Sequence, residues 1–138
     1  MNRCFQKILS GDTSNQEAQA SKYYWNNLFN EEEPYFTRER SGIYPNNFLN
    51  YGYAVLRATV ARGLVSSGLL PTLGIHHSNK YNAYCLADDI MEPYRPVVDQ
   101  LICTLYQQYP EDPGLTTAIK QELLQLPVLD VWIEGVNS

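Results

Sequence analysis

The stretch NNFLNYGYAVLRATVARGLVSSG (residues 46–68) decides the fold class of this chain. Its large apolar side chains recur every three or four residues, which is the spacing of one face of an α-helix. They are Leu49, Tyr53, Leu56, Val60 and Leu64. Gly68 and Pro71 follow, and both residue types end helices. We therefore predict a helix over residues 46–68 in a chain of the all-α class.

Helical patterns flank this stretch on both sides. Residues 11–29 (GDTSNQEAQASKYYWNNLF) predict a helix that begins after a loop. Residues 85–109 predict another, which Pro93 and Pro96 should bend or break near Met91. A weaker amphipathic segment covers residues 115–130 and is broken at Pro127.

Length and composition fit one domain over residues 1–138 that lies in the cytoplasm. The sequence is 44% hydrophobic, which is enough for a single core. It has no apolar run of about 18 residues and no apolar signal-peptide region, so we expect no membrane segment. Its cysteines, Cys4, Cys85 and Cys103, are far apart, and we expect reduced, partly buried thiols.

The net charge of −5 argues against a domain that coats nucleic acid by bulk electrostatics. The charges are unevenly distributed, however. Residues 38–95 contain six Lys or Arg against four Asp or Glu. A bound divalent cation would make the field of this middle segment still more positive.

Candidate chemistry is concentrated in LPTLGIHHSNKYNAYCLADDIMEPYRP (residues 70–96). Asp88 and Asp89 lie four and three residues before Glu92, so either aspartate should share a helical face with it. Like charges on one helical face cost energy unless an opposite charge compensates them. One candidate is Arg95, which would make the cluster an ordinary solvated charge run. The other is a divalent metal ion, because carboxylate oxygens are suitable hard ligands.

Two histidines precede this acidic helix, and one of them could face the carboxylates. His76 or His77 could equally be a capping or core residue, or could join Cys85 in a zinc site. Glu17, in the first turn of the first predicted helix, could simply interact favourably with the helix dipole. It could also supply a third metal ligand with His77 and Glu92, since phosphodiester chemistry uses a metal held by two or three side chains.

Three blocks together resemble one family, the CRISPR adaptation integrase known as CRISPR-associated protein one, in its type II form. Residues 11–29 are similar to its Glu-small-x-Ala-x-x-Tyr helix. Residues 45–77 are similar to its central helix and histidine loop, and residues 79–99 to its acidic helix. The blocks follow one another in the family's order.

The resemblance implies roles for individual residues. Glu17, His77 and Glu92 would be the metal ligands and catalytic residues, with Asp89 as an auxiliary acid. Five basic residues would fit DNA contacts: Arg38, Arg40, Arg57, Lys80 and Arg95. For Arg57 and Arg95, pairing between helices is an equally suitable role.

The resemblance also implies a function, cofactors and partners. The family inserts short foreign DNA into a CRISPR array by transesterification with Mg²⁺ or Mn²⁺, as a homodimer that joins a small ferredoxin-like protein. The chain would be the α-helical catalytic domain, a fragment without the family's N-terminal β-rich domain and its extreme C-terminus. Two alternatives stay open. One is an inactive remnant that binds DNA or a partner protein, and the other is a tyrosine recombinase with a covalent phosphotyrosine and no metal requirement.

Overall fold

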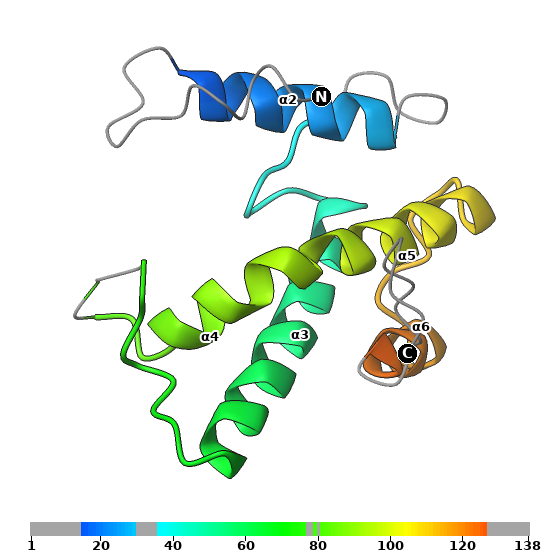
Figure 1. Ribbon diagram of the computed structural model, residues 1–138. Helices are drawn as coiled ribbons and strands as arrows, with labels where there is room; N and C mark the ends of the chain where they lie inside the picture. Colours follow the sequence, from blue (N-terminus) through cyan, green and yellow to red (C-terminus); the bar gives the residue numbers. More distant parts are fainter. Residues whose placement is uncertain (1–14, 30–35, 77–78, 80, 127–138) are drawn as a thin grey trace, which may run out of the picture. The chain divides into compact units, whose positions relative to one another are not determined.

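The computed structural model describes residues 15–29, 36–76, 79 and 81–126 (Figure 1). The chain forms two compact units, Met1–Gly42 and Ile43–Ser138, and each is described by itself. Every regular element in the described residues is a helix, which confirms the all-α prediction. Within the same residues, no helix combines the length and apolar character needed to cross a lipid bilayer.

The first unit contains α2 (Gln16–Leu28) and the segment that follows it after residue 35. Aromatic packing joins these two parts. The Trp25 ring lies 5.5 Å from the Phe36 ring and 6.3 Å from the Phe29 ring, and the Phe29 and Phe36 rings are 4.4 Å apart. All three side chains are buried, so this cluster fixes residues 36–38 against the helix.

The predicted central helix of the second unit is confirmed as α3 (Asn46–Ser66). Leu49 and Leu64 of its apolar stripe are buried, while the other members of the stripe, Tyr53, Leu56 and Val60, are half-buried. The helix ends in a left-handed Gly68, with φ 77°. The Gly68 N–H donates to the Val65 carbonyl at 3.0 Å and the Leu69 N–H to the Leu64 carbonyl at 2.9 Å, the two bonds of a Schellman motif.

The predicted break near Met91 is also confirmed. Helix α4 (Cys85–Met91) gives way to a 3₁₀ turn, η1 (Glu92–Tyr94), before α5 (Arg95–Gln108) begins. Proline lacks the N–H of an α-helical hydrogen bond and its ring clashes with the preceding turn, which accounts for the break. Glu92 therefore stands at a joint between two helices.

Helix α3 packs against α4, α5 and the last helix, α6 (Thr117–Leu124) (Figure 1). It lies close to α5 at Gly52, where an added Cβ would lie 2.6 Å from Cγ1 of the buried Val98. The Thr116 hydroxyl accepts the Ile119 N–H at 3.4 Å and caps α6. Pro127, where we predict a break in the segment over residues 115–130, lies outside the described residues.

Two of the three cysteines lie in the described residues. Cys85 is buried and Cys103 is half-buried, and neither forms a disulfide bond, while their reduced state stays a prediction. Cys4 lies outside the described residues.

Candidate functional site

Asp88 is buried in the interface between α4 and α3, with 6% of its surface exposed. Arg57 of α3 binds it through two hydrogen bonds. Arg57 Nε donates to Asp88 Oδ1 and Arg57 Nη2 donates to Asp88 Oδ2, both at 2.6 Å. The hydrogen bond to Asp88 raises the pKa of the Arg57 guanidinium above its ordinary value. This forked geometry is specific to arginine and compensates the buried carboxylate.

The same carboxylate holds the chain that leads into α4. The Asn82 side-chain amide donates to Asp88 Oδ2 at 2.7 Å, and Asn82 Oδ1 accepts the Tyr84 N–H at 2.9 Å. The Arg57 guanidinium also lies over the Tyr84 ring, 5.3 Å from its centre. Asp88 is thus the meeting point of α3, α4 and the loop before α4.

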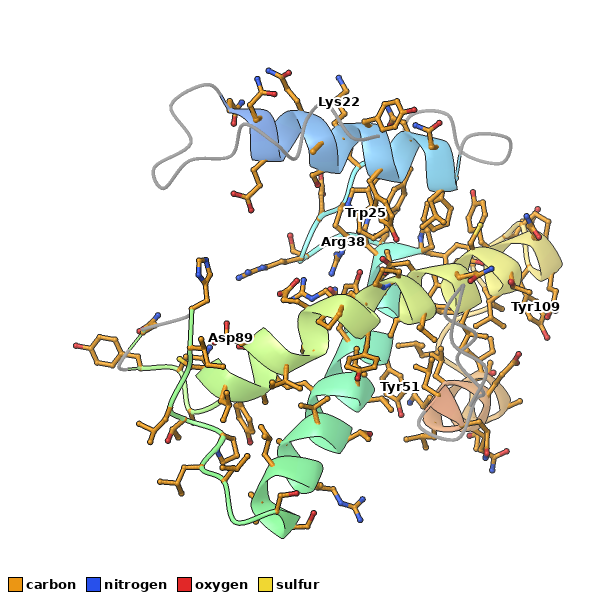
Figure 2. All side chains as sticks on the ribbon, viewed as in Figure 1. Lys22, Trp25, Arg38, Tyr51, Asp89 and Tyr109 are labelled. Atoms are coloured by element: carbon orange, nitrogen blue, oxygen red, sulfur yellow. The ribbon has the colours of Figure 1, made fainter. Side chains whose placement is uncertain are left out.

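Asp89, the next residue, holds an earlier part of this loop (Figure 2). Its Oδ2 accepts the backbone N–H of Ile75 at 2.6 Å and that of His76 at 2.8 Å. A carboxylate that accepts two N–H groups forms strong, charge-assisted bonds. His77 is the next residue of the chain and lies outside the described residues, as does Lys80.

The negative charge of Glu92 is compensated by Arg95, three residues later in the chain. Arg95 Nη2 lies 2.9 Å from Glu92 Oε1, and the two side chains are 40% and 48% exposed. The Arg95 guanidinium lies over the Tyr53 ring, 5.2 Å from its centre. The solvated pairing of Glu92 with Arg95 that the sequence suggested is therefore present. Asp88, in contrast, finds its offset in Arg57 on another helix.

The zinc alternative receives no support from the described residues. Cys85 is 2% exposed, and its thiol donates to the backbone carbonyls of Asn79 and Asn82 at 3.5 and 3.3 Å. His76 is exposed. Among the residues that the structure describes, no group of three His, Cys, Asp or Glu side chains comes together to hold a metal ion.

Glu17 lies exposed in the first turn of α2, in the first unit of the chain. Glu92 and the histidine loop belong to the second unit. The predicted set of Glu17, His77 and Glu92 therefore stays a prediction.

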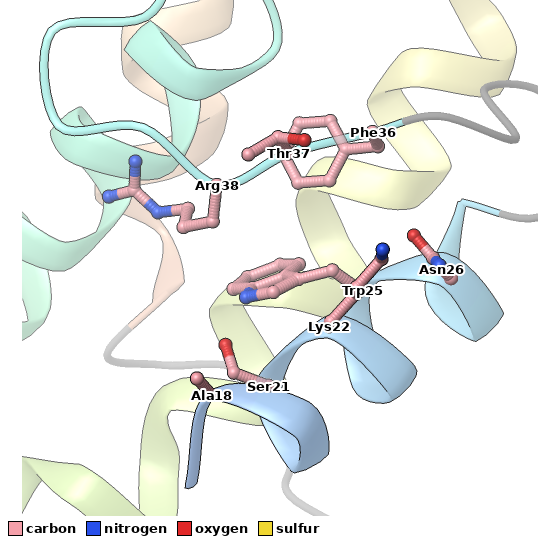
Figure 3. Close-up of a pocket in the computed structure, with 8 residues that line it drawn as sticks. All are labelled: Ala18, Ser21, Lys22, Trp25, Asn26, Phe36, Thr37 and Arg38. Carbon is pink, nitrogen blue, oxygen red and sulfur yellow. The ribbon is translucent and has the colours of Figure 1, made fainter. Parts of the chain in front are cut away.

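The first unit carries a pocket of about 630 Å³ with an aromatic wall and two cationic side chains (Figure 3). The Trp25 ring points from α2 toward the segment of Phe36 and Arg38, and Lys22 lies one turn before Trp25 on the helix. The complete lining is Ala18, Ser21, Lys22, Trp25, Asn26, Phe36, Thr37 and Arg38. Arg38 Nη1 also donates to the Glu39 carbonyl at 2.6 Å, and Arg40 is exposed.

The sequence singles out Arg38 and Arg40 as candidate DNA contacts, which stay predictions, but it does not single out Lys22 or Asn82. Lys22 lies three residues before Trp25 on the same predicted helix, so the sequence indicates that these two side chains share a helical face. Asn82 carried no signal, because its role depends on a contact with Asp88 that only the folded loop creates.

Comparisons with known proteins agree on one family. The chain matches the family described as CRISPR associated protein Cas1 over residues 11–112, and it belongs to this family. A CRISPR-associated endonuclease Cas1 of Neisseria meningitidis serogroup C (strain 8013) is 44% identical over 128 residues, which are 93% of this chain and 41% of that protein. A CRISPR-associated endonuclease Cas1 2 of Pyrobaculum aerophilum is 33% identical over 83% of this chain and 39% of its own length. The chain spans about two fifths of the length of these relatives.

Proposed function

We propose that this protein acts in CRISPR adaptation as a metal-dependent DNA endonuclease and integrase that inserts short foreign DNA into a CRISPR array. Family membership supports the role in adaptation, and the name endonuclease that its relatives carry supports cleavage of phosphodiester bonds. Insertion would proceed by transesterification, in which a DNA 3′-hydroxyl attacks a phosphodiester at the repeat boundary and no protein nucleophile is used.

The observation that carries this proposal is the pair of hydrogen bonds from Ile75 and His76 to Asp89. They tie the loop that enters the histidine pair to the helix that leads to Glu92, three residues beyond Asp89. A site that unites a loop histidine with a helix acid needs such bonds, because its ligands must be held in place.

The donor set fits Mg²⁺ or Mn²⁺. Glu17, His77 and Glu92 would hold the ion, and two carboxylates with one imidazole leave open positions for water and phosphate. The bound ion would polarise the scissile phosphate and stabilise the charge of the transition state. Asp89 Oδ2 already accepts two backbone N–H groups, so its auxiliary role would be to hold the loop.

Basic side chains would position the DNA. Arg38 and Lys22 line the pocket of the first unit, and Arg40 is exposed nearby in the sequence, so these residues and Lys80 suit phosphate contacts. Partners follow from the family resemblance. We propose that the functional assembly is a homodimer joined to a small ferredoxin-like protein.

A branched-DNA assay tests this function. We expect nicking or strand transfer with Mn²⁺ or Mg²⁺, none with EDTA, and loss of the reaction in His77→Ala. His76→Ala is the matched control, because it keeps the backbone N–H that Asp89 accepts. DNA that is bound but left intact by the wild type would contradict the proposal and favour the inactive remnant. A covalent protein–DNA adduct formed in EDTA would favour the tyrosine recombinase.

A further inference from the structure

We infer that Arg57 is a positioning residue for the candidate site, which acts through Asp88 on the loop between α3 and α4, and that it does not bind DNA phosphate. This inference rests on the proposed function and deepens it. A basic residue beside a predicted DNA-processing site would ordinarily be assigned to phosphate. The contacts of Arg57 point inward instead.

The guanidinium of Arg57 is held against Asp88 by two hydrogen bonds. Both hydrogen bonds from Arg57 to Asp88 measure 2.6 Å, and they use Nε and Nη2, the two nitrogens of one edge. The ring of Tyr84 lies against the guanidinium at 5.3 Å. Asp88 is nearly fully buried, so withdrawing Arg57 toward a phosphate would leave an uncompensated buried carboxylate.

Asp88 also binds the loop that precedes α4. It accepts from Asn82, whose own Oδ1 accepts the Tyr84 N–H. The Leu86 N–H donates to the Pro71 carbonyl at 2.7 Å, and the Cys85 thiol donates to the carbonyls of Asn79 and Asn82. The first two turns of α4 therefore bind the loop at several points along its length.

The adjacent carboxylates Asp88 and Asp89 bind different parts of the loop. Asp89 binds residues 75 and 76, before the second histidine in sequence, and Asp88 binds Asn82, after it. Asp88 is also connected to another helix, through Arg57 of α3. Arg57 thus anchors to the core of the unit a carboxylate that fixes the far end of the histidine loop.

Three variants separate positioning from DNA contact. Arg57→Lys keeps the positive charge but lacks the fork that binds both carboxylate oxygens. Arg57→Gln removes the charge, and Arg62→Gln, on the exposed face of the same helix, is the matched control. Positioning predicts that Arg57→Lys and Arg57→Gln both lower kcat for nicking on the order of tenfold, with KM for DNA and the salt dependence of binding unchanged.

A double-mutant cycle adds a test that instability alone would not mimic. Positioning through Asp88 predicts that Arg57→Gln combined with Asp88→Asn costs no more kcat than the worse single variant. A phosphate contact would overturn the inference. In that case Arg57→Lys would be active. Arg57→Gln would weaken DNA binding and lower the slope of log affinity against log salt concentration by about 1. The losses of kcat in Arg57→Gln and Asp88→Asn would then multiply in the double variant.

Hydrogen exchange decides the matter without DNA or metal, so failure of the proposed function would not hide the answer. In Arg57→Lys that keeps its helical circular dichroism, the amides of Tyr84 and Leu86, on the side of the loop that Asp88 holds, should exchange faster than in the wild type. Protection equal to that of Arg62→Gln at both amides would overturn the inference. Unchanged exchange in Arg57→Lys would refute the positioning role. Absence of nicking by the wild type would separately refute the proposed function.

Discussion

Asp89 accepts the backbone N–H of His76 at 2.8 Å, so the side chain of a helix holds the main chain of the histidine loop. The same oxygen accepts the N–H of Ile75 at 2.6 Å. An acid in this position fixes the geometry of the loop at Ile75 and His76.

Replacing Asp89 by alanine should loosen the histidine loop. Hydrogen bonds to a charged acceptor contribute about 1.5–3 kcal/mol each, and the two donors here are exposed enough for water to recover most of that. We expect a modest loss of global stability, about 1 kcal/mol, with clearly faster hydrogen exchange at Ile75 and His76. Glu122→Ala, at an exposed position of α6, is the control. Equal protection of both amides in the two variants would show that Asp89 does not hold the loop.

Gly52 should resist substitution because of its contact with α5. Gly52→Ala would place a methyl group 2.6 Å from the buried Val98 side chain, and overpacking of this kind costs about 1–3 kcal/mol. Gly63→Ala, on the same helix with nothing within 4 Å of the added Cβ, should instead gain up to about 1 kcal/mol from helix propensity. Urea denaturation measures both. The Val98→Ala change should relieve the Gly52→Ala defect, and additive losses in the double variant would refute the packing account.

Tyr44 should make stability fall at high pH. Burial, with contributions from Tyr106 and Asp112, raises the pKa of Tyr44 to about 12, and its hydroxyl donates to the Tyr109 carbonyl at 2.6 Å. Between pH 10 and 12 the unfolded state loses this proton while the folded state keeps it, so the free energy of unfolding decreases as pH rises. Tyr44→Phe should show a shallower decrease over this window than wild type or Tyr51→Phe. Identical slopes in all three proteins would contradict the assignment.

Arg95 should weaken metal binding by competing for Glu92. Its ion pair with Glu92 is half-exposed and contributes little to stability, about 0–1 kcal/mol. Arg95→Ala would leave the carboxylate free and the local field more negative, so Mn²⁺ should bind a few-fold more tightly in calorimetry. Arg62→Ala should leave the affinity unchanged. Weaker Mn²⁺ binding by Arg95→Ala would show that Arg95 orients Glu92 and does not compete for it.

Local patterns predicted the helices, and long-range contacts decided the site. The period of residues 46–68, Gly68 and the two prolines after Met91 act within a few residues, so the sequence alone places α3 and the joint at Glu92. The Glu92–Arg95 pair is equally local. Arg57 and Asp88 are 31 residues apart, and Asp89 binds backbone groups 13 and 14 residues before it. No periodicity encodes such pairings, since they arise only when α4 packs against α3 and described residues of the preceding loop bind to α4.

The central claim is that Glu17, His77 and Glu92 form one metal site. Calorimetric titration of Mn²⁺ into the wild type, Glu17→Ala, His77→Ala and Glu92→Ala tests it most directly, with His76→Ala as the control. The account predicts clear binding by the wild type and His76→Ala and its loss in each of the other three variants. Equal binding in all five proteins would contradict it.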